Sequence, residues 1–278
     1  MKVRRLLSCW LVAGFGIGLF GDDTETVVPF AQLSPVVQKS IQAQLANGTL
    51  GTISRDEEDG ETVYSAEITK GGQPRTYSFN EAGVLVSMEV SLRETPLAVQ
   101  MAIQAQIGTG TLENIDKNID EGEVSYDVEW KTKAGAERSG TVLESGKVES
   151  VQIGLEETPP AVRAAITQET GSGQLKDVFK SFEDKAVLYD VTVNRDGKDR
   201  EFTVAENGKL DSRQLFLSEL PAPAQATIQR TIGKGRLVRI DLVFEKKKNV
   251  FPYEVKSIVD GKPYDFSVGP KGLFLGVD

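Results

Sequence analysis

Residues 158–217 read TPPAVRAAITQETGSGQLKDVFKSFEDKAVLYDVTVNRDGKDREFTVAENGKLDSRQLFL, and this pattern of residues recurs along the chain. It opens with a Thr-Pro pair and apolar residues at Val162 and Ile166, which are typical of a short helix. Gly-Ser-Gly and an acidic segment follow, and then alternating apolar residues are interrupted by Asp-Gly and Asn-Gly. The helical isoleucines Ile41, Ile103, Ile166 and Ile228 lie 62, 63 and 62 residues apart, which indicates an internal repeat.

Other positions keep this spacing to within one residue in the first three copies and come two residues late in the fourth. A turn glycine recurs at Gly83, Gly146, Gly208 and Gly272, and a tyrosine at Tyr64, Tyr126, Tyr189 and Tyr253. We expect these tyrosines to be part of the core, because a residue repeated so regularly is more often structural than specific to one site.

Each copy predicts one helix followed by about four strands. The Thr-Pro pairs at 95–96 and 158–159, and Ser34-Pro35, supply a capping hydroxyl before a proline at the first helical position. The Gly-x-Gly segments that follow end the helix, and the alternation in Val187–Val193 then predicts an antiparallel meander. The predicted fold class is α+β, with four tandem repeats, each one helix packed on a roughly four-stranded antiparallel meander sheet.

The predicted boundaries follow from this spacing. Residues 1–21 are expected to be a signal peptide or an N-terminal anchor, because Lys2, Arg4 and Arg5 precede an uncharged stretch. Residues 22–32 are expected to be a flexible tether. The repeats are predicted to be 33–93, 94–156, 157–218 and 219–278, joined by short links.

The composition excludes several kinds of chemistry. The chain has no histidine, and its one cysteine, Cys9, lies in the leader. Hydrolases that use a histidine base, thiolate metal sites and disulfides in the mature chain are therefore excluded. No constellation of Ser, Lys, Asp or Glu recurs as a catalytic site would, so the sequence predicts a protein that is not an enzyme and needs no cofactor.

Trp130 occupies a strand position that is held by Ile68, Val193 and Ser257 in the other copies. Its copy is also the one in which Gly140 replaces the aromatic residue of the third strand. We predict that Trp130 lies on the same sheet face as Gly140, opposite or diagonal to it, and fills the volume of the missing ring.

Two segments are candidate binding sites. The acidic run Asp56–Glu61 could hold calcium, but the corresponding turn of the fourth copy is basic, which favours a solvated hairpin tip. A two-residue insertion gives the fourth copy the loop Lys246, Lys247, Lys248 and Phe251, which is predicted to contact an acidic partner or lipid headgroups unless it is simply a longer hairpin. No metal site is predicted.

Charge is distributed unevenly along the chain. The four predicted repeats carry net charges of −3, −7, −2 and +3, and the whole chain carries −9. Nucleic acid is an unfavourable partner for such a chain. A cationic partner suits the second copy, and an anionic partner suits the fourth.

The helix, the glycine followed by Leu-x-x-Ile, the Tyr-x-Val-x-Val strand, Asp-Gly-Lys and Phe-x-Val resemble PepSY-like modules, which are related to the β-lactamase-inhibitor fold. The resemblance covers residues 33–278, and the matching positions are structural. It implies an exported bacterial protein, periplasmic or extracellular, that binds a target in the cell envelope.

The leading hypothesis is therefore an exported, non-enzymatic binding protein of the cell envelope that inhibits or regulates a peptidase. Its partner is expected to be another envelope or secreted protein, and contact with the membrane is expected only through an uncleaved leader. Two alternatives remain: a structural or scaffolding envelope protein, and a weak calcium binder that uses the acidic hairpin tips.

Overall fold

The computed structural model describes residues 26–58, 61–120, 122–183, 186–244 and 251–277. The chain forms two compact units, an N-terminal unit that ends at Glu149 and a C-terminal unit that begins at Ser150. The predicted leader, residues 1–21, lies outside the described residues. No helix in the described part of the chain is both long and apolar enough to span a bilayer.

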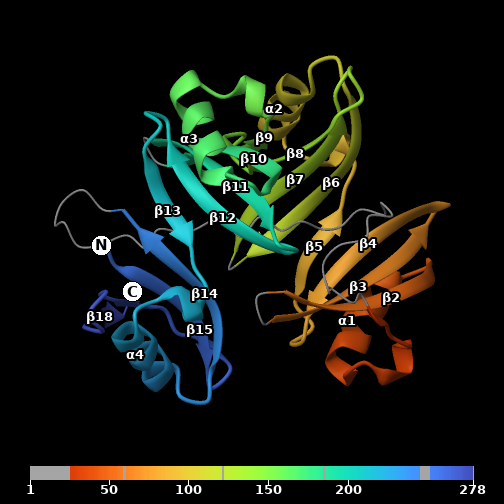
Figure 1. The fold of residues 1–278 in the computed structure, drawn as a ribbon. Coiled ribbons are helices and arrows are strands. Elements are labelled where there is room, and N and C mark those ends of the chain that lie inside the picture. The colour runs from red at the N-terminus through yellow and green to blue at the C-terminus, as the bar shows by residue number, and fades with distance from the viewer. Residues whose placement is uncertain (1–25, 59–60, 121, 184–185, 245–250, 278) are drawn as a thin grey trace. The chain divides into compact units, whose positions relative to one another are not determined.

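The N-terminal unit contains two helices among antiparallel strands (Figure 1). The helices are α1 (Pro35–Leu45) and α2 (Leu97–Ile107). The strands are β1 (Thr26–Val27), β2 (Thr49–Glu58), β3 (Glu61–Lys70), β4 (Gln73–Asn80), β5 (Leu85–Glu89), β6 (Thr111–Asp120), β7 (Glu123–Lys131) and β8 (Glu137–Leu143). Strand β9 (Val148–Gln152) crosses the division between the units.

The C-terminal unit repeats this order of elements. Its helices are α3 (Pro160–Thr170) and α4 (Ala222–Ile232). Its strands are β10 (Gln174–Glu183), β11 (Ala186–Arg195), β12 (Lys198–Ala205), β13 (Leu210–Gln214), β14 (Arg236–Val243), β15 (Tyr253–Val259), β16 (Lys262–Pro263), β17 (Phe266–Val268) and β18 (Phe274–Val277).

The predicted fold class, four modules with a small sheet each, is wrong. In the described residues the strands belong to one 18-stranded sheet whose pairings are antiparallel. The last strand before a helix pairs with the first strand after it, as Ser87 with Asn118 in β5–β6 and Ser212 with Val243 in β13–β14. The physical reason is the edge of the sheet: a separate four-stranded sheet would leave two rows of backbone N–H and C=O groups unpaired, and these pairings satisfy them.

The predicted links are also more regular than expected. A three-residue 3-10 helix lies at each predicted joint: η2 (Leu92–Glu94), η3 (Leu155–Glu157) and η4 (Leu217–Glu219). These 3-10 helices were not predicted, since the sequence indicated only short links. The repeat boundaries near residues 93, 156 and 218 remain predictions. The division into two compact units falls between Glu149 and Ser150 and does not test them.

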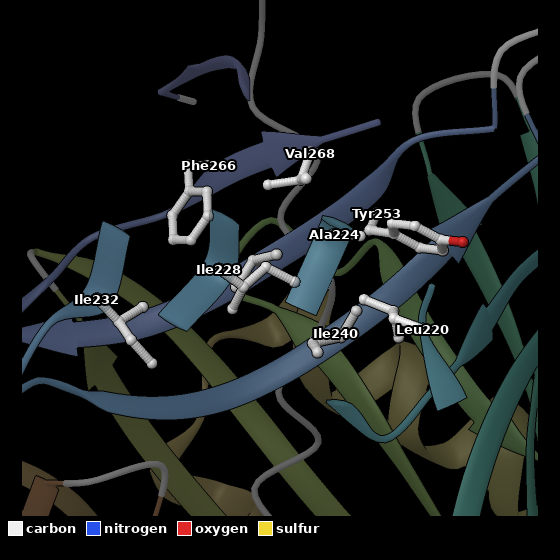
Figure 2. Close-up of a cluster of buried hydrophobic side chains, with 9 residues drawn as sticks. Leu220, Ala224, Ile228, Ile232, Ile240, Tyr253, Phe266 and Val268 are labelled. Carbon is white, nitrogen blue, oxygen red and sulfur yellow. The ribbon is translucent and has the colours of Figure 1, made fainter. Parts of the chain in front are cut away.

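Each helix buries the predicted apolar stripe against the sheet. Ile41, Ile103, Ile166 and Ile228 are fully buried. Figure 2 shows the α4 cluster, in which Ala224, Ile228 and Ile232 point towards strand residues that include Ile240, Tyr253 and Phe266. Burying a side chain of this size contributes roughly 1.5–3 kcal/mol, so two or three such residues suffice to hold an 11-residue helix in place.

The helix starts differ from the prediction by one residue. The hydroxyls of Thr95 and Thr158 do not cap α2 and α3; they donate to the carbonyl oxygens of Leu92 (2.9 Å) and Leu155 (2.6 Å) in the preceding 3-10 helices. Ser34 does cap α1, because its Oγ accepts from the amide of Val37. A short 3-10 helix thus competes for the threonine hydroxyls, which local sequence rules do not anticipate.

The recurring turn glycines have a steric cause. Gly208 adopts φ +78°, and a Cβ atom added there would lie 2.7 Å from the carbonyl oxygen of Ala161 in α3. Gly272 meets Pro223 of α4 in the same way. A side chain at this turn would push the helix off the sheet, so the repeated glycine is a packing requirement.

The predicted tether is partly ordered. Thr26 and Val27 form β1 and pair with Arg55 and Ser54 of β2, and Phe30–Gln32 form the 3-10 helix η1. The expectation of a flexible segment is therefore wrong for residues 26–32, while residues 22–25 lie outside the described part of the chain. Val28 and Phe30 pack against the α1 core, which accounts for the order.

The end of α1 gives the first testable prediction. Ala46 follows α1 with φ 45° and ψ −113°, whereas glycine occupies the matching position after the other helices, as at Gly108 (φ 56°, ψ −112°). This conformation strains a residue that carries a Cβ atom, so Ala46→Gly is expected to raise the free energy of unfolding by about 1 kcal/mol. Urea unfolding measures the change.

Gly108→Ala is the matched control for Ala46→Gly. A Cβ atom at Gly108 would have no neighbour within 4 Å, so the substitution tests the backbone alone and should cost about as much as Ala46→Gly gains. If both variants unfolded at the wild-type urea concentration, the backbone strain at Ala46 would be disproved.

Candidate functional site

The predicted contact loop is only partly described. Lys246, Lys247 and Lys248 lie outside the described residues. Phe251 is described and is 44% exposed, and its ring centroid lies 5.6 Å from that of Phe244. The aromatic residue is therefore available at the surface, and the binding role of the loop remains a prediction.

The acidic segments connect paired strands. Glu58 pairs with Glu61 in β2–β3, and Asp120 pairs with Glu123 in β6–β7. These residues therefore lie at the ends of hairpins. In the described part of the chain no three acidic side chains gather as metal ligands would.

Trp130 lies where the sequence analysis placed it. In the β7–β8 pair, Gly140 lies opposite Val128 and Arg138 lies opposite Trp130. Since alternate strand residues share a face, Trp130 is diagonal to Gly140 on the same face, and it is 4% exposed. The predicted placement is confirmed, and a role for Trp130 as an exposed ligand platform is excluded. That its ring fills the volume of the missing aromatic residue remains a prediction. Tyr126, Tyr189 and Tyr253 are buried as expected, while Tyr64 is only half-buried.

The sheet face opposite the helices is polar. We call it the helix-free face; it carries the residues that alternate with the core, such as Asp127 between Tyr126 and Val128, and Asp190 between Tyr189 and Val191. Among the side chains that the structure describes in the N-terminal unit, the acidic residues of this face are Asp56, Glu67, Glu89, Asp116, Asp120, Glu123, Asp127, Glu129 and Glu137, and Lys131 lies on the same face.

Two carboxylates on this face are held by neighbouring strands. Asp127 accepts hydrogen bonds from Asn118 Nδ2 and Thr141 Oγ1, both at 2.6 Å. Asp190 accepts from Ser181 Oγ (2.7 Å) and Thr203 Oγ1 (2.8 Å). Burial raises the pKa of both carboxyls, and the hydrogen bonds oppose it in part.

The most concentrated negative charge lies in β5, β6 and β7. Glu89 is directly opposite Asp116 in the β5–β6 pair, and Asp116 is directly opposite Asp127 in the β6–β7 pair. Glu129 is opposite Asn114, two residues along the same face. We call Glu89, Asp116, Asp127 and Glu129 the acidic cluster. Like charges directly opposite each other destabilise a sheet, so this row has an energetic cost.

The pKa of Asp116 shows the effect of burial and of the neighbouring negative charges. Burial raises the pKa of Asp116 to about 7, and the negative charges of Glu89, Asp127 and Glu129 add to the effect. Its hydrogen bond from Asn114 Nδ2 (2.6 Å) opposes the rise. The pKa of Glu129 is also raised, first by burial and then by neighbouring carboxylates. The residues directly opposite Asp116 in the two strand pairs, Glu89 and Asp127, are both acidic.

In the C-terminal unit, the row of residues that corresponds to the acidic cluster includes a cation. Gln214 is opposite Asp241, which is opposite Glu254, in the strands β13, β14 and β15. Here Arg239 donates to both carboxylate oxygens of Asp241, from Nε at 2.6 Å and from Nη2 at 2.9 Å, and also binds Glu201 of β12. Arg239 lies two residues before Asp241, as Asn114 lies two residues before Asp116.

A pocket of about 390 Å³ adjoins the acidic cluster. Its wall includes Gln73 and Arg75 of β4, Glu89 of β5 and Asn114 of β6. Arg75 is engaged elsewhere, because its guanidinium forms two hydrogen bonds with the carboxylate of Glu94, at 2.7 and 2.9 Å. The hydrogen bonds from Arg75, and then those from Ser91, lower the pKa of Glu94 to about 2.

The sequence analysis did not identify this arginine–glutamate pair, although both of its residues recur at the repeat spacing. Arg200 pairs with Glu219 at the corresponding position, donating from Nη1 to both carboxylate oxygens at 2.8 and 2.9 Å. The arginines Arg75, Arg138 and Arg200 and the glutamates Glu94, Glu157 and Glu219 each lie 63 and 62 residues apart. The acidic cluster was not predicted either, because only the β5–β6 pairing brings Glu89 to Asp116.

Comparison with known proteins gives partial resemblances. No family model matches the sequence, and no curated protein does. Several solved structures resemble part of the chain. A DUF2874 family protein from Bacteroides ovatus is 15% identical and covers 42% of this chain and 84% of its own, with a TM-score of 0.33.

A BLIP-like protein from Bacteroides fragilis is 16% identical and covers 44% of this chain and 84% of its own, with a TM-score of 0.31. A Bacteroides thetaiotaomicron protein, provisionally named calcium-regulated and periplasmic, is 14% identical and covers 46% and 96%, with a TM-score of 0.30. The chain thus resembles, over less than half its length, proteins that include one called BLIP-like, and similarities of this size identify no family.

Proposed function

We propose that this protein is an exported, non-enzymatic binding protein of the bacterial cell envelope that holds a partner protein on the helix-free face of its N-terminal unit. The observation that carries the proposal is the charge of that face, where Lys131 is accompanied by nine carboxylates. Such a face favours a basic partner and speeds its encounter. An envelope peptidase is the class of partner that the resemblance implies.

The face suits protein binding better than catalysis. Its central side chains are serine, threonine, asparagine and aspartate, and those of Asp127 and Asp190 are fixed by hydrogen bonds from both neighbouring strands. Rigid polar groups at fixed spacing give specificity without a conformational cost on binding. The loop of Lys246, Lys247, Lys248 and Phe251 remains a separate predicted contact for an acidic partner.

Neutralising exposed carboxylates on this face should weaken partner binding. Asp56, Glu67 and Asp120 are exposed on the helix-free face, so the triple variant Asp56→Asn, Glu67→Gln and Asp120→Asn is expected to bind a partner captured from native envelope at least tenfold more weakly at low salt. The difference should shrink as salt is added, because screening removes the charge contribution. Surface plasmon resonance with the full-length chain measures both effects.

The matched control neutralises three exposed carboxylates away from that face, with Glu57→Gln, Glu81→Gln and Glu144→Gln. This variant has the same net charge as the first and should bind like the wild type. Equal losses in the two variants would show that overall charge, and not this face, governs binding. Retention of full affinity by the first variant would refute the proposed face.

A further inference from the structure

We infer that the acidic cluster of Glu89, Asp116, Asp127 and Glu129 binds the guanidinium group of an arginine that belongs to a partner protein. The inference rests on the proposed function and specifies the chemistry of the partner. Its basis is a comparison of two rows of the same sheet that share their strand register, of which the C-terminal row contains cations and the N-terminal row does not.

The two rows correspond residue by residue. Glu89, Asn114 and Asp116 lie 125 residues before Gln214, Arg239 and Asp241. Strand pairing confirms the correspondence, because β5–β6–β7 and β13–β14–β15 place these residues in the same register. The protein therefore contains, in its own C-terminal unit, a filled version of the N-terminal row.

The charges of the two rows do not balance in the same way. Around Asp241 the carboxylates of Glu201 and Glu254 are accompanied by Arg239 and Lys256. Around Asp116 the corresponding positions hold Thr76, Asp127, Asn114 and Glu129, so four carboxylates of the cluster face no cation among them. The C-terminal row thus sets two cations against three carboxylates, whereas the cluster has four carboxylates, so a guanidinium would reduce this difference.

Neighbouring cations are already bound elsewhere. Arg75 is paired with Glu94, and Lys131 Nζ lies 2.6 Å from Glu113 and 3.6 Å from Glu137. The C-terminal unit shows that a bound arginine in the Arg75 position does not exclude a second guanidinium, since Arg200 is paired with Glu219 while Arg239 binds Asp241.

A pocket reaches the cluster at Glu89. Arg239 extends from β14 towards Glu201 on β12. In the N-terminal unit the pocket of about 390 Å³ is bounded by the corresponding strands, with Gln73 and Arg75 on β4 and Asn114 on β6. A planar guanidinium is favoured over an ammonium group because it can donate two parallel hydrogen bonds to one carboxylate, as Arg239 does.

The test uses the purified full-length chain and a defined probe. The tripeptide acetyl-Gly-Arg-Gly-amide is titrated while the backbone amides of residues 89, 114, 116 and 127 are followed by NMR. The expected result is saturable binding with a dissociation constant of about 1 mM or tighter. The same peptide with citrulline, a neutral isostere of arginine, should cause no saturable change.

Asn114→Arg supplies the missing cation from within the chain. It should raise the melting temperature and weaken peptide binding at least tenfold, because the site is then occupied. Ser125→Arg adds the same charge on the same face, outside the cluster, and should leave the affinity within about twofold. If Asn114→Arg does not fold, Asp116→Asn provides the same binding test.

Three outcomes would overturn the inference: equal binding of the citrulline peptide, unchanged peptide affinity in a folded Asn114→Arg protein, or micromolar calcium binding that Asn114→Arg abolishes. The third would replace the guanidinium by a metal ion. If the peptide does not bind but a captured partner still binds the helix-free face, only the arginine site is refuted. Peptide binding without any envelope partner would instead refute the proposed function.

Discussion

Replacing Arg239 with methionine is expected to lower the free energy of unfolding by about 3 kcal/mol, because Asp241 would remain buried without its partner. The carboxylate of Asp241 is only 2% exposed, and Arg239 donates two hydrogen bonds to it. Removing one member of a buried ion pair leaves an uncompensated charge in a poorly solvated site. Urea unfolding of the full chain measures the loss.

Two further variants isolate the cause of that loss. Arg55→Met removes an arginine whose pair with Glu57 is solvent-exposed, with side chains 39% and 63% exposed, and should change stability far less than Arg239→Met does. The double variant Arg239→Met and Asp241→Asn should recover most of the stability, because the buried charge is gone. A double variant no more stable than Arg239→Met alone would show that packing of the arginine stem causes the loss.

Replacing Asp116 with asparagine is expected to stabilise the protein at pH 8 by the order of 2 kcal/mol and to have little effect at pH 4. Burial, together with Glu89, Asp127 and Glu129, raises the pKa of Asp116 to about 7 in the folded protein, against 3.8 for an unperturbed aspartate. Between these values the folded state retains a proton that the unfolded state has lost. The stability of the wild type therefore decreases as the pH rises from about 4 to about 7, and the penalty is complete above pH 7.

Thermal unfolding of wild type and Asp116→Asn at pH 4, 6 and 8 tests this pH dependence. The difference in melting temperature should be near zero at pH 4 and largest at pH 8, because asparagine has no charge to be desolvated. Glu144→Gln removes an exposed carboxylate and should show no such trend. A gain of the same size at all three pH values would mean that the charge of Asp116 does not destabilise the fold.

Local features of the fold could be predicted because neighbouring residues decide them. The apolar spacing at Val162 and Ile166 gave the helix and its buried face, and the Asp-Gly and Asn-Gly pairs gave the hairpins that the structure contains. The position of Trp130 diagonal to Gly140 followed from strand alternation alone.

The candidate site could not be predicted, because it depends on residues that meet only in the sheet. Glu89 and Asp116 are separated by a 3-10 helix, a joint and α2, and nothing in either segment shows that β5 and β6 pair. The binding residues singled out by the sequence, Lys246, Lys247, Lys248 and Phe251, were chosen for an insertion and for charge, which are visible without the fold.

The sequence by itself determined the order of helices and strands, the buried stripe of each helix and the turn glycines, because these depend on residue periodicity and on short-range backbone sterics. Only the tertiary structure decided that strands pair across the joints into one sheet, because sheet edges pair by backbone hydrogen bonds that carry no side-chain signature. That pairing also decided where charges meet, and so placed four carboxylates together in one unit and a buried arginine in the corresponding place of the other.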